Sequence, residues 1–319
     1  MGRLVDLLTD RLGGHPTPET DVPDDERAML SLAADAAENP RTVSLSDGRE
    51  LGYAEFGDPD GTSLVLCHGF PNSRVFGALF DAVGREEGVR VITPDRPGMG
   101  VSDPDPDRSL TDWPADVRDL LDALDVRRTA VLGISGGGPY ALATAALLDD
   151  RVTRTGVACG VGPMASVGLR ERAWYYTARF APPASKLALW LLGRRATRDR
   201  ESFLESLAED AAPADRALWT GEVGRVVHAS MVESTRNHGI DPLVRETAIY
   251  GSPWGFDLAD VGVPVYLWYG KADALVPPEM GLYLARELPT AEAHVYPDLG
   301  HLSVFRRNET AIVRALTGR

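Results

Sequence analysis

The chain has 319 residues, of which 44% are hydrophobic and 25% are charged. This composition is typical of a globular protein, and the length suits one large α/β domain or a core with an insertion. The 47 acidic and 33 basic residues give a formal net charge of −14. We expect no nucleic-acid partner and no attraction to anionic membrane surfaces, because the negative field repels both.

The sequence predicts a cytoplasmic protein without membrane insertion. No apolar run reaches the roughly 18 residues of a membrane span, and charges interrupt the apolar residues of the opening MGRLVDLLTDRLGG, unlike a signal peptide. Cys67 and Cys159 lie in apolar, strand-like runs, which favours two buried free thiols over a disulfide framework. The oligomeric state stays open. The acidic excess fits either a high-GC genome or adaptation to salt.

Residues 1–40 are expected to form a helical N-terminal extension, with two short amphipathic helices around the linker HPTPETDVPDDE. From residue 41 apolar residues alternate, and Asp47-Gly48 marks the turn of a hairpin. Further strands are predicted at 63–69, 89–95, 129–135, 152–160, 263–270 and 291–297. Helices are predicted at 73–88, 109–126, 137–150, 277–288 and from the loop after the last strand to residue 317. This alternation predicts an α/β fold, with a mostly parallel, eight-stranded-type sheet flanked by helices.

Residues 163–257 interrupt this alternation. They carry no strand period, and they are rich in large aromatic side chains. Because they stand between two predicted strands, we expect a helical cap inserted into a core made of residues 41–162 and 258–319. Most of the aromatic residues should pack inside the cap. Contacts with a substrate by some of them, such as Trp174, Tyr175 and Trp254, stay open.

A serine stands between glycines where a predicted strand meets a predicted helix. The run Gly133-Ile134-Ser135-Gly136-Gly137 fits G-x-S-x-G in the strand–turn–helix context that a nucleophile elbow requires. The glycines allow the tight turn, and the helix N-terminus places free N–H groups and a positive dipole end near the serine. We therefore predict that Ser135 is a nucleophile.

A serine hydroxyl needs a base, usually a histidine that a carboxylate orients. Of the six histidines, His301 follows the last predicted strand, at the same carboxyl edge of the sheet as Ser135. Asp273 follows the penultimate strand and is the predicted acid, with Asp298 in reserve. The order Ser135, Asp273, His301 matches serine–acid–histidine triads on α/β sheets.

The loop HGFP after the third predicted strand supplies the second half of an oxyanion hole. We expect the backbone N–H groups of Phe70 and Gly136 to bind the oxyanion, with His68 in a structural role. Asp95 and Arg96 are expected to pair beneath a fixed loop next to the site. No cofactor is implied, because the chain has no phosphate-binding loop and no cluster with metal-ligand spacing.

The motifs HGFP, DRPGMGVSD, GISGGG, GKAD and GH occur in one order, and over residues 41–319 the chain resembles the α/β-hydrolase superfamily. The resemblance is to the cap-bearing, esterase-like branch with a serine nucleophile. Dehalogenases and epoxide hydrolases of the superfamily use aspartate where this chain has Ser135. Proline iminopeptidases carry HGGPG where this chain has HGFPN.

The resemblance implies a serine hydrolase that cleaves a carboxylic ester, or a related acyl bond, of a small molecule through an acyl-enzyme. Acyl transfer, perhydrolysis and carbon–carbon bond hydrolysis use the same three residues and stay open. A ligand-binding receptor on a hydrolase scaffold is the alternative outside enzymes, because a fold does not fix a function.

Overall fold

The computed structural model describes residues 24–319, apart from the side chains of residues 24–26, 169–171 and 174. The first predicted helix of the extension lies outside this range, and the second is α2 (Asp24–Glu38). At the centre stands a sheet of eight strands in the order β1-β2-β4-β3-β5-β6-β7-β8. The strands are β1 (Arg41–Ser44), β2 (Glu50–Gly57), β3 (Thr62–Cys67), β4 (Val89–Pro94), β5 (Thr129–Ile134), β6 (Val152–Ala158), β7 (Val265–Gly270) and β8 (Ala291–Tyr296).

Only β2 runs in the opposite direction to the other strands of the sheet. The predicted hairpin pairs β1 with β2, and β2 runs antiparallel to β4. Every other neighbouring pair of strands is parallel. The carboxyl ends of β5, β7 and β8, which precede the three predicted triad residues, therefore lie along one edge of the sheet. The predicted α/β fold class is confirmed.

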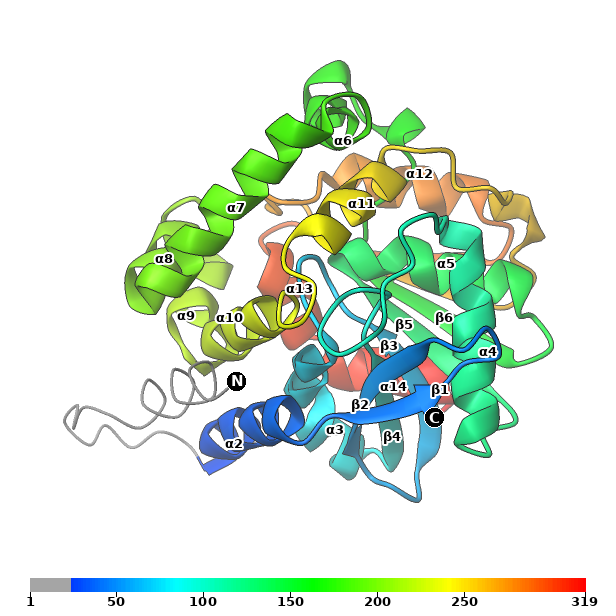
Figure 1. Cartoon of the computed structure of the whole chain (residues 1–319). Helices are drawn as coiled ribbons and strands as arrows, with labels where there is room; N and C mark the ends of the chain where they lie inside the picture. The colour runs from blue at the N-terminus through cyan, green and yellow to red at the C-terminus, as the bar shows by residue number, and fades with distance from the viewer. Residues whose placement is uncertain (1–23) are drawn as a thin grey trace.

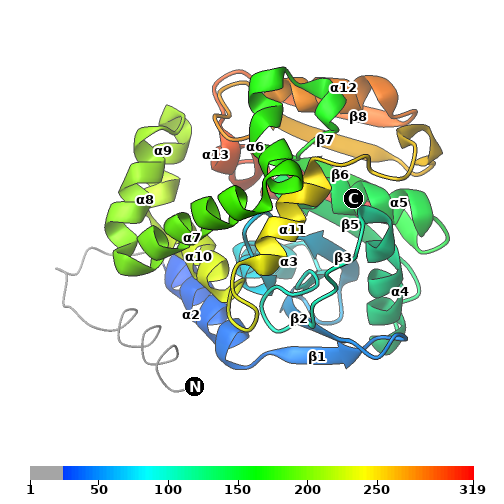
Figure 2. The same ribbon diagram turned by 45° about the horizontal axis from the view of Figure 1, so that its top comes forward.

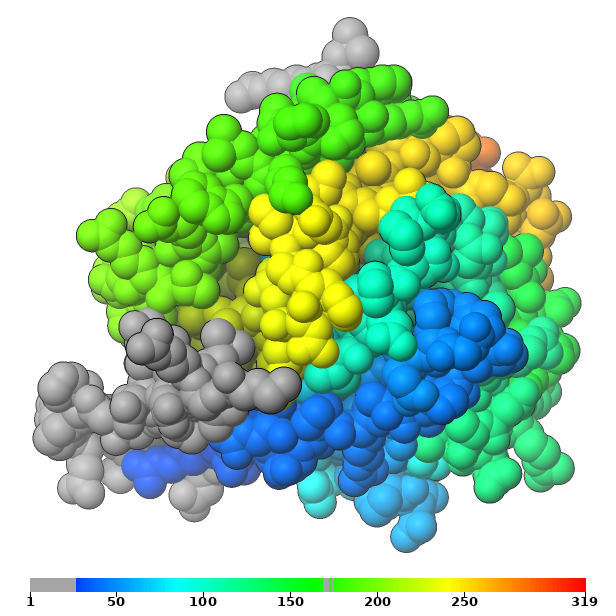
Figure 3. Space-filling view, viewed as in Figure 1, coloured from blue at the N-terminus to red at the C-terminus, as the bar shows by residue number. Residues whose placement is uncertain are grey.

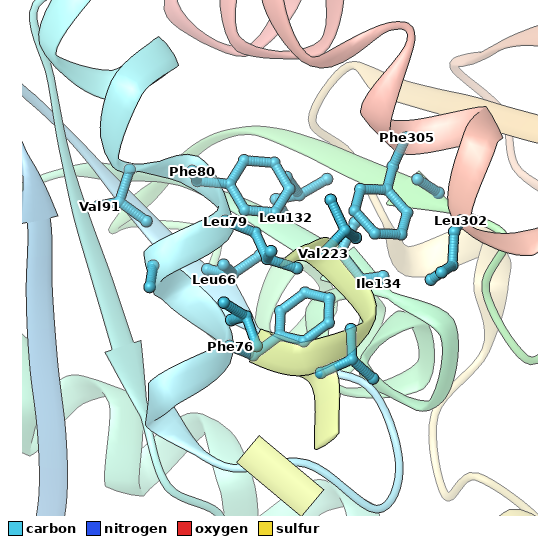
Figure 4. Close-up of a cluster of buried hydrophobic side chains, with 14 of the residues drawn as sticks. Leu66, Phe76, Leu79, Phe80, Val91, Leu132, Ile134, Val223, Leu302 and Phe305 are labelled. Carbon is cyan, nitrogen blue, oxygen red and sulfur yellow. The ribbon is translucent and has the colours of Figure 1, made fainter. Parts of the chain in front are cut away.

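Helices cover both faces of the sheet, as Figures 1 and 2 show. One face carries α3 (Asp81–Glu86), α13 (His301–Arg306), α14 (Glu309–Thr317) and the 3₁₀ segment η1 (Arg74–Phe80); the other carries α4 (Trp113–Ala123), α5 (Gly138–Leu147) and α12 (Pro278–Glu287). Successive side chains along each strand point to opposite faces of the sheet, so the sheet divides the hydrophobic core into two layers. On β3, Leu64 and Leu66 belong to the first face, and Val65 and Cys67 belong to the second. Figure 4 shows the first of these layers, where Leu66 and Leu132 meet Phe76, Phe80 and Phe305.

Two helix predictions need correction. The segment 73–88 is not one helix, because η1 is a 3₁₀ turn that gives way to the short α3 at Asp81. Every residue of η1 is buried, so tertiary packing sets its conformation. The last predicted helix is two helices, α13 and α14, and His301 is the first residue of α13 instead of a loop residue.

Between β6 and β7 the described chain forms helices and no strand. We call them the inserted helices: α6 (Leu169–Phe180), α7 (Pro182–Arg198), α8 (Arg200–Glu209), α9 (Pro213–Thr220), α10 (Glu222–Glu233) and α11 (Asp241–Tyr250). They lie over the sheet edge that bears Ser135, and α2 packs beside α10 (Figures 1 and 2). Arg236, just after α10, donates to the carbonyl oxygen of Ala37 at 2.5 Å. The N-terminal helix therefore supports the inserted helices.

Candidate active site

Ser135 stands where β5 gives way to helix, in the left-handed backbone conformation that a nucleophile elbow requires. Its φ is 54°, which a side chain rarely adopts without support from its surroundings. A Cβ on Gly133 would lie 2.5 Å from the carbonyl oxygen of Gly137, so only glycine allows this turn. The amide of Val161 donates to the carbonyl oxygen of Ser135 at 2.9 Å and holds the turn against β6.

Asp273 and His301 form a direct pair next to this turn. Nδ1 of His301 donates to Oδ2 of Asp273 at 2.8 Å. The other carboxylate oxygen of Asp273 accepts from the amides of Leu275 and Val276 at 2.8 and 2.9 Å. The carboxylate is therefore fixed by its own loop, and its hydrogen bond to Nδ1 leaves the lone pair of the imidazole on Nε2. The reserve acid Asp298 is exposed in the turn after β8.

The surroundings of His301 change its protonation. Burial lowers the pKa of the imidazole, but the charge of Asp273 and contacts with the buried Cys159 raise it more, so the pKa lies well above the ordinary value of 6.5. Cys159 has a φ of 44°, and burial raises the pKa of its thiol. Ligand atoms of Cys159, Asp273 and His301 lie within 4.8 Å of one another. A metal ion at this group would have to displace both the thiol proton and the His301–Asp273 hydrogen bond.

The loop with Phe70 lies directly against the turn with Gly136. A Cβ on Gly136 would come within 2.8 Å of the Phe70 Cβ, and one on Gly69 within 3.4 Å of the Ser135 Cβ. The guanidinium of Arg96 donates to the carbonyl oxygens of His68 and Gly69 at 2.5 and 2.9 Å. These bonds hold the loop by its carbonyl groups and leave the following amides for an oxyanion.

The expected pair between Asp95 and Arg96 is not formed. Asp95 pairs instead with Arg74 at 2.7 Å, and Arg96 pairs with Glu246 of α11 at 2.7 Å. Glu246 also pairs with Arg108 at 2.6 Å. All of these side chains are almost completely buried. The pKa of Glu246 stays below its ordinary value, because the arginines and tyrosine hydroxyls outweigh the burial that would raise it.

Glu246 also reaches the oxyanion turn from the other side. The hydroxyl of Tyr250 lies 2.6 Å from Oε1 of Glu246 and 3.0 Å from the carbonyl oxygen of Gly136. Through Arg96 and Tyr250, one buried carboxylate of α11 thus contacts both segments that form the predicted oxyanion hole. Nothing in the local sequence of Glu246 marks this function.

Asp215 of α9 was also missed by the sequence reasoning. Its carboxylate accepts from the backbone amides of Leu302 and Ser303 at 3.1 and 2.9 Å, the two residues that follow His301. Asp215 is buried, and a Cβ on Gly300 would collide with its Oδ2. An inserted helix therefore holds the first turn of α13, which carries His301, so Asp215 is a positioning residue for the imidazole.

Ser135 and His301 line one cavity of about 300 Å³ beneath the inserted helices, together with Phe70 and Gly136. Of the aromatic residues whose substrate contacts stayed open, Tyr175 lines this cavity and stacks edge-on against Tyr250. Trp254 instead stacks on Phe256 in a separate surface cavity. The side chain of Trp174 lies outside the described part of the chain.

Of the other five histidines, His15 lies outside the described residues, and none of the remaining four lines the cavity that holds Ser135 and His301. They are His68, buried with Nδ1 2.9 Å from the Gly69 carbonyl oxygen; His228, against the Ala196 carbonyl oxygen; His238, in a surface groove; and His294, beside Glu292 on β8. Burial lowers the pKa of His68 well below 6.5, which fits the structural role expected for it.

In the part of the chain that the structure describes, no helix is long and apolar enough to cross a bilayer.

Comparison with known proteins agrees with the fold. Residues 64–315 match the sequence model of the alpha/beta hydrolase family, and the chain belongs to that family. It is 30% identical over 277 residues to the dihydrolipoyllysine-residue acetyltransferase component of the acetoin cleaving system of Pseudomonas putida, a match that covers 84% of this chain and 66% of that relative.

A hydrolase and a solved esterase are also similar to the chain. The 2-hydroxymuconate semialdehyde hydrolase of Pseudomonas putida is 29% identical over 217 residues, which are 66% of this chain and 70% of the relative. A thermophilic esterase from Thermogutta terrifontis has a TM-score of 0.63 and 21% identity, and covers 88% of this chain and 98% of its own. At that identity the second likeness concerns the fold alone.

The raised pKa of His301 predicts how activity depends on pH. The imidazole must be neutral to accept a proton, so kcat/KM should fall with acid around an inflection above pH 6.5. In Asp273→Asn the charge that raises the pKa is lost, so the inflection should move to lower pH, and kcat should drop on the order of 10³-fold or more. The measurement is kcat/KM against pH for both proteins. An inflection at or below pH 6.5 in the unchanged protein would contradict the assignment.

Asp215→Asn should lower kcat by about tenfold to 100-fold with little change in KM, because a misplaced base slows the chemical step more than binding. Glu233→Gln is the matched control: it also removes a buried carboxylate from an inserted helix, but Glu233 binds Arg74 at 2.8 Å and not α13. The control should lower the melting temperature and keep kcat. Equal kcat in folded Asp215→Asn and the unchanged protein would rule out the positioning role.

Glu246→Gln should lower the free energy of unfolding by about 3–5 kcal/mol, because it leaves two buried arginines without a charged partner. Asp241→Asn removes the partner of Lys186 in an exposed pair and should cost at most about 1 kcal/mol. Urea denaturation of both variants measures the difference. A loss of the same small size in both would mean that the buried network adds no stability.

Proposed function

We propose that the chain is a serine hydrolase that cleaves a carboxylic ester of a small molecule through an acyl-enzyme intermediate. One observation carries the proposal. Ser135, in the strained conformation of a nucleophile elbow, lines the same cavity as His301, and the Nδ1 of His301 is hydrogen-bonded to Asp273.

In the mechanism that this geometry supports, Nε2 of His301 takes the hydroxyl proton as Ser135 attacks the ester carbonyl carbon. Asp273 keeps the imidazole in the required tautomer and stabilises its charged form. The amides of Phe70 and Gly136 bind the oxyanion of the tetrahedral intermediate. His301 then returns the proton to the leaving alcohol. Water, activated by the same imidazole, attacks the acyl-enzyme and releases the acid and Ser135.

The inserted helices serve this reaction as a cap, for which we retain the boundaries 163–257. They cover Ser135 from the sheet edge and contribute Tyr175 of α6 and Tyr250 of α11 to the cavity wall. Enclosure keeps bulk water away and strengthens the electrostatic interactions inside. A cavity of about 300 Å³ under such a cover suits a small molecule.

Hydrolysis of a carbon–carbon bond is the second candidate. The similarity to a 2-hydroxymuconate semialdehyde hydrolase favours it, and the same serine, histidine and oxyanion amides perform that reaction on a ketone. The two candidates differ in the bond that breaks after the proton transfer, and the triad geometry is common to both.

Ser135→Ala tests the mechanism. Hydrolysis of 4-nitrophenyl esters of increasing chain length should fall by on the order of 10³-fold or more in the variant. Labelling by a fluorophosphonate should occur in the unchanged protein and be absent in the variant. Ser166→Ala, which alters a partly buried serine that donates to the Pro163 carbonyl oxygen, is the control and should keep both. Turnover retained in Ser135→Ala would sink the assignment, and labelling without turnover of any ester would favour a receptor.

A further inference from the structure

We infer that the catalytic cavity is built for an uncharged acyl group with an apolar chain, which lies among α8, α9, α10 and α13. The inference rests on the proposed ester hydrolysis at Ser135 and adds the class of substrate. Three features of the described residues carry it: the arrangement of polar atoms, the absence of Lys, Arg, Asp and Glu side chains from the wall, and an apolar groove that adjoins the cavity.

The polar atoms of the cavity gather around Ser135. Asn72 and Ser135 both line the cavity, and a Cβ on Gly69 would contact both, at 3.1 Å from Nδ2 of Asn72 and 3.4 Å from the Ser135 Cβ. Oδ1 of Asn72 is buried and has no hydrogen-bond partner among the described residues. The Tyr250 hydroxyl contacts the Gly136 carbonyl oxygen. The polar end of a substrate, its ester group, is thus recognised at Ser135.

Away from Ser135 the wall is apolar. The side chains that form it come from inserted helices and from the sheet face below: Phe203 and Leu207 of α8, Trp219 of α9, Val227 and Met231 of α10, Leu302 and Phe305 of α13, and Phe76 of η1. Figure 4 shows Phe76, Leu302 and Phe305 around the same part of the core. A hydrocarbon chain gains free energy with each methylene that it buries against such a wall.

Among the described residues that line the cavity, none is a lysine, arginine, aspartate or glutamate. The buried arginines of this region, Arg96 and Arg108, both pair with Glu246 and are not part of the lining. A carboxylate on the acyl chain would therefore lose its hydration without gaining a cation, which is strongly unfavourable. The wall thus selects against an anionic acyl group.

A second, smaller groove adjoins the cavity between α7, α10 and α11. It shares Pro71, Leu192 and Met231 with the cavity. Figure 3 shows the surface hollowed between the green helices and the yellow α11. Most of the side chains that line the groove are apolar, among them Leu189 and Leu192 of α7 and Leu243 of α11. The groove is therefore apolar like the neighbouring cavity wall.

A pair of substrates that differ only in charge tests the inference directly. The probes are 4-nitrophenyl hexanoate and mono-4-nitrophenyl adipate, whose chain of equal carbon number ends in a carboxylate. We expect kcat/KM to favour the hexanoate by at least about 100-fold, because even an added neutral hydroxyl can cost that much in an apolar pocket. From acetate to hexanoate, kcat/KM should rise up to about fourfold per methylene.

Two variants of α8 locate the chain. Leu207→Ala removes part of the wall and enlarges the cavity, so the ester with the highest kcat/KM should have a longer acyl chain. Leu204→Ala is the matched control, because Leu204 is buried on the same helix but does not line the cavity; it should leave the preferred length unchanged. Leu207→Lys offers a cation and should reduce the preference for hexanoate over adipate at least tenfold. The same optimum in the two alanine variants would overturn the placement of the chain.

Failure of this inference can be distinguished from failure of the proposed function. Turnover of the adipate equal to that of the hexanoate, lost in Ser135→Ala, would overturn the substrate class and leave the serine hydrolase standing. Labelling of Ser135 by a fluorophosphonate without turnover of either ester would likewise overturn the substrate class. Absence of both labelling and turnover would overturn the proposed function and, with it, this inference.

Discussion

The site depends on the close approach of backbone to backbone behind Ser135. A Cβ on Gly137 would collide with the carbonyl groups of Cys67 and His68, so the start of the helix lies directly against the end of β3. This contact places the nucleophile next to the loop that holds Phe70. It also commits the chain to the left-handed turn at Ser135, whose φ of 54° only its packed surroundings can maintain. This contact brings Ser135, the N-terminus of the helix and the loop with Phe70 together in one place.

Buried carboxylates of the inserted helices fix the remaining parts. Asp215 of α9 binds the turn that carries His301, and Glu246 of α11 contacts both segments of the proposed oxyanion hole through Arg96 and Tyr250. Glu233 of α10 pairs with Arg74 and so ties a third helix to the core. A buried ion pair contributes little net stability compared with well-packed apolar residues, but it costs much when one partner is lost. Its effect here is to fix the positions of the inserted helices relative to the sheet edge.

The sequence predicts the features that depend on residues close together in the chain. Alternating and periodic apolar residues give the strands and their order, and G-x-S-x-G gives the turn, because glycine is needed at fixed places. The contacts of Asp215 and Glu246 could not be predicted in this way, since their partners lie 88 and 138 residues away in the chain. The expected pairing of Asp95 with Arg96 was wrong for a local reason. Successive side chains at the end of an extended strand point to opposite sides, and each therefore found its partner on another element.

The helix α9 contacts both the turn that carries His301 and the cavity. Asp215, near its start, holds the backbone after His301, and Trp219, four residues later and hence on the same side of the helix, lines the catalytic cavity. Because α9 runs only from Pro213 to Thr220, Trp219 and Asp215 lie within one short helix. By contrast, α8 contributes Phe203 and Leu207 to the wall without a hydrogen bond to α13 among the described residues. Substitutions of Phe203 or Leu207 on α8 therefore leave the Asp215 contact in place, whereas α9 carries both a wall residue, Trp219, and the residue that binds the turn of His301, Asp215.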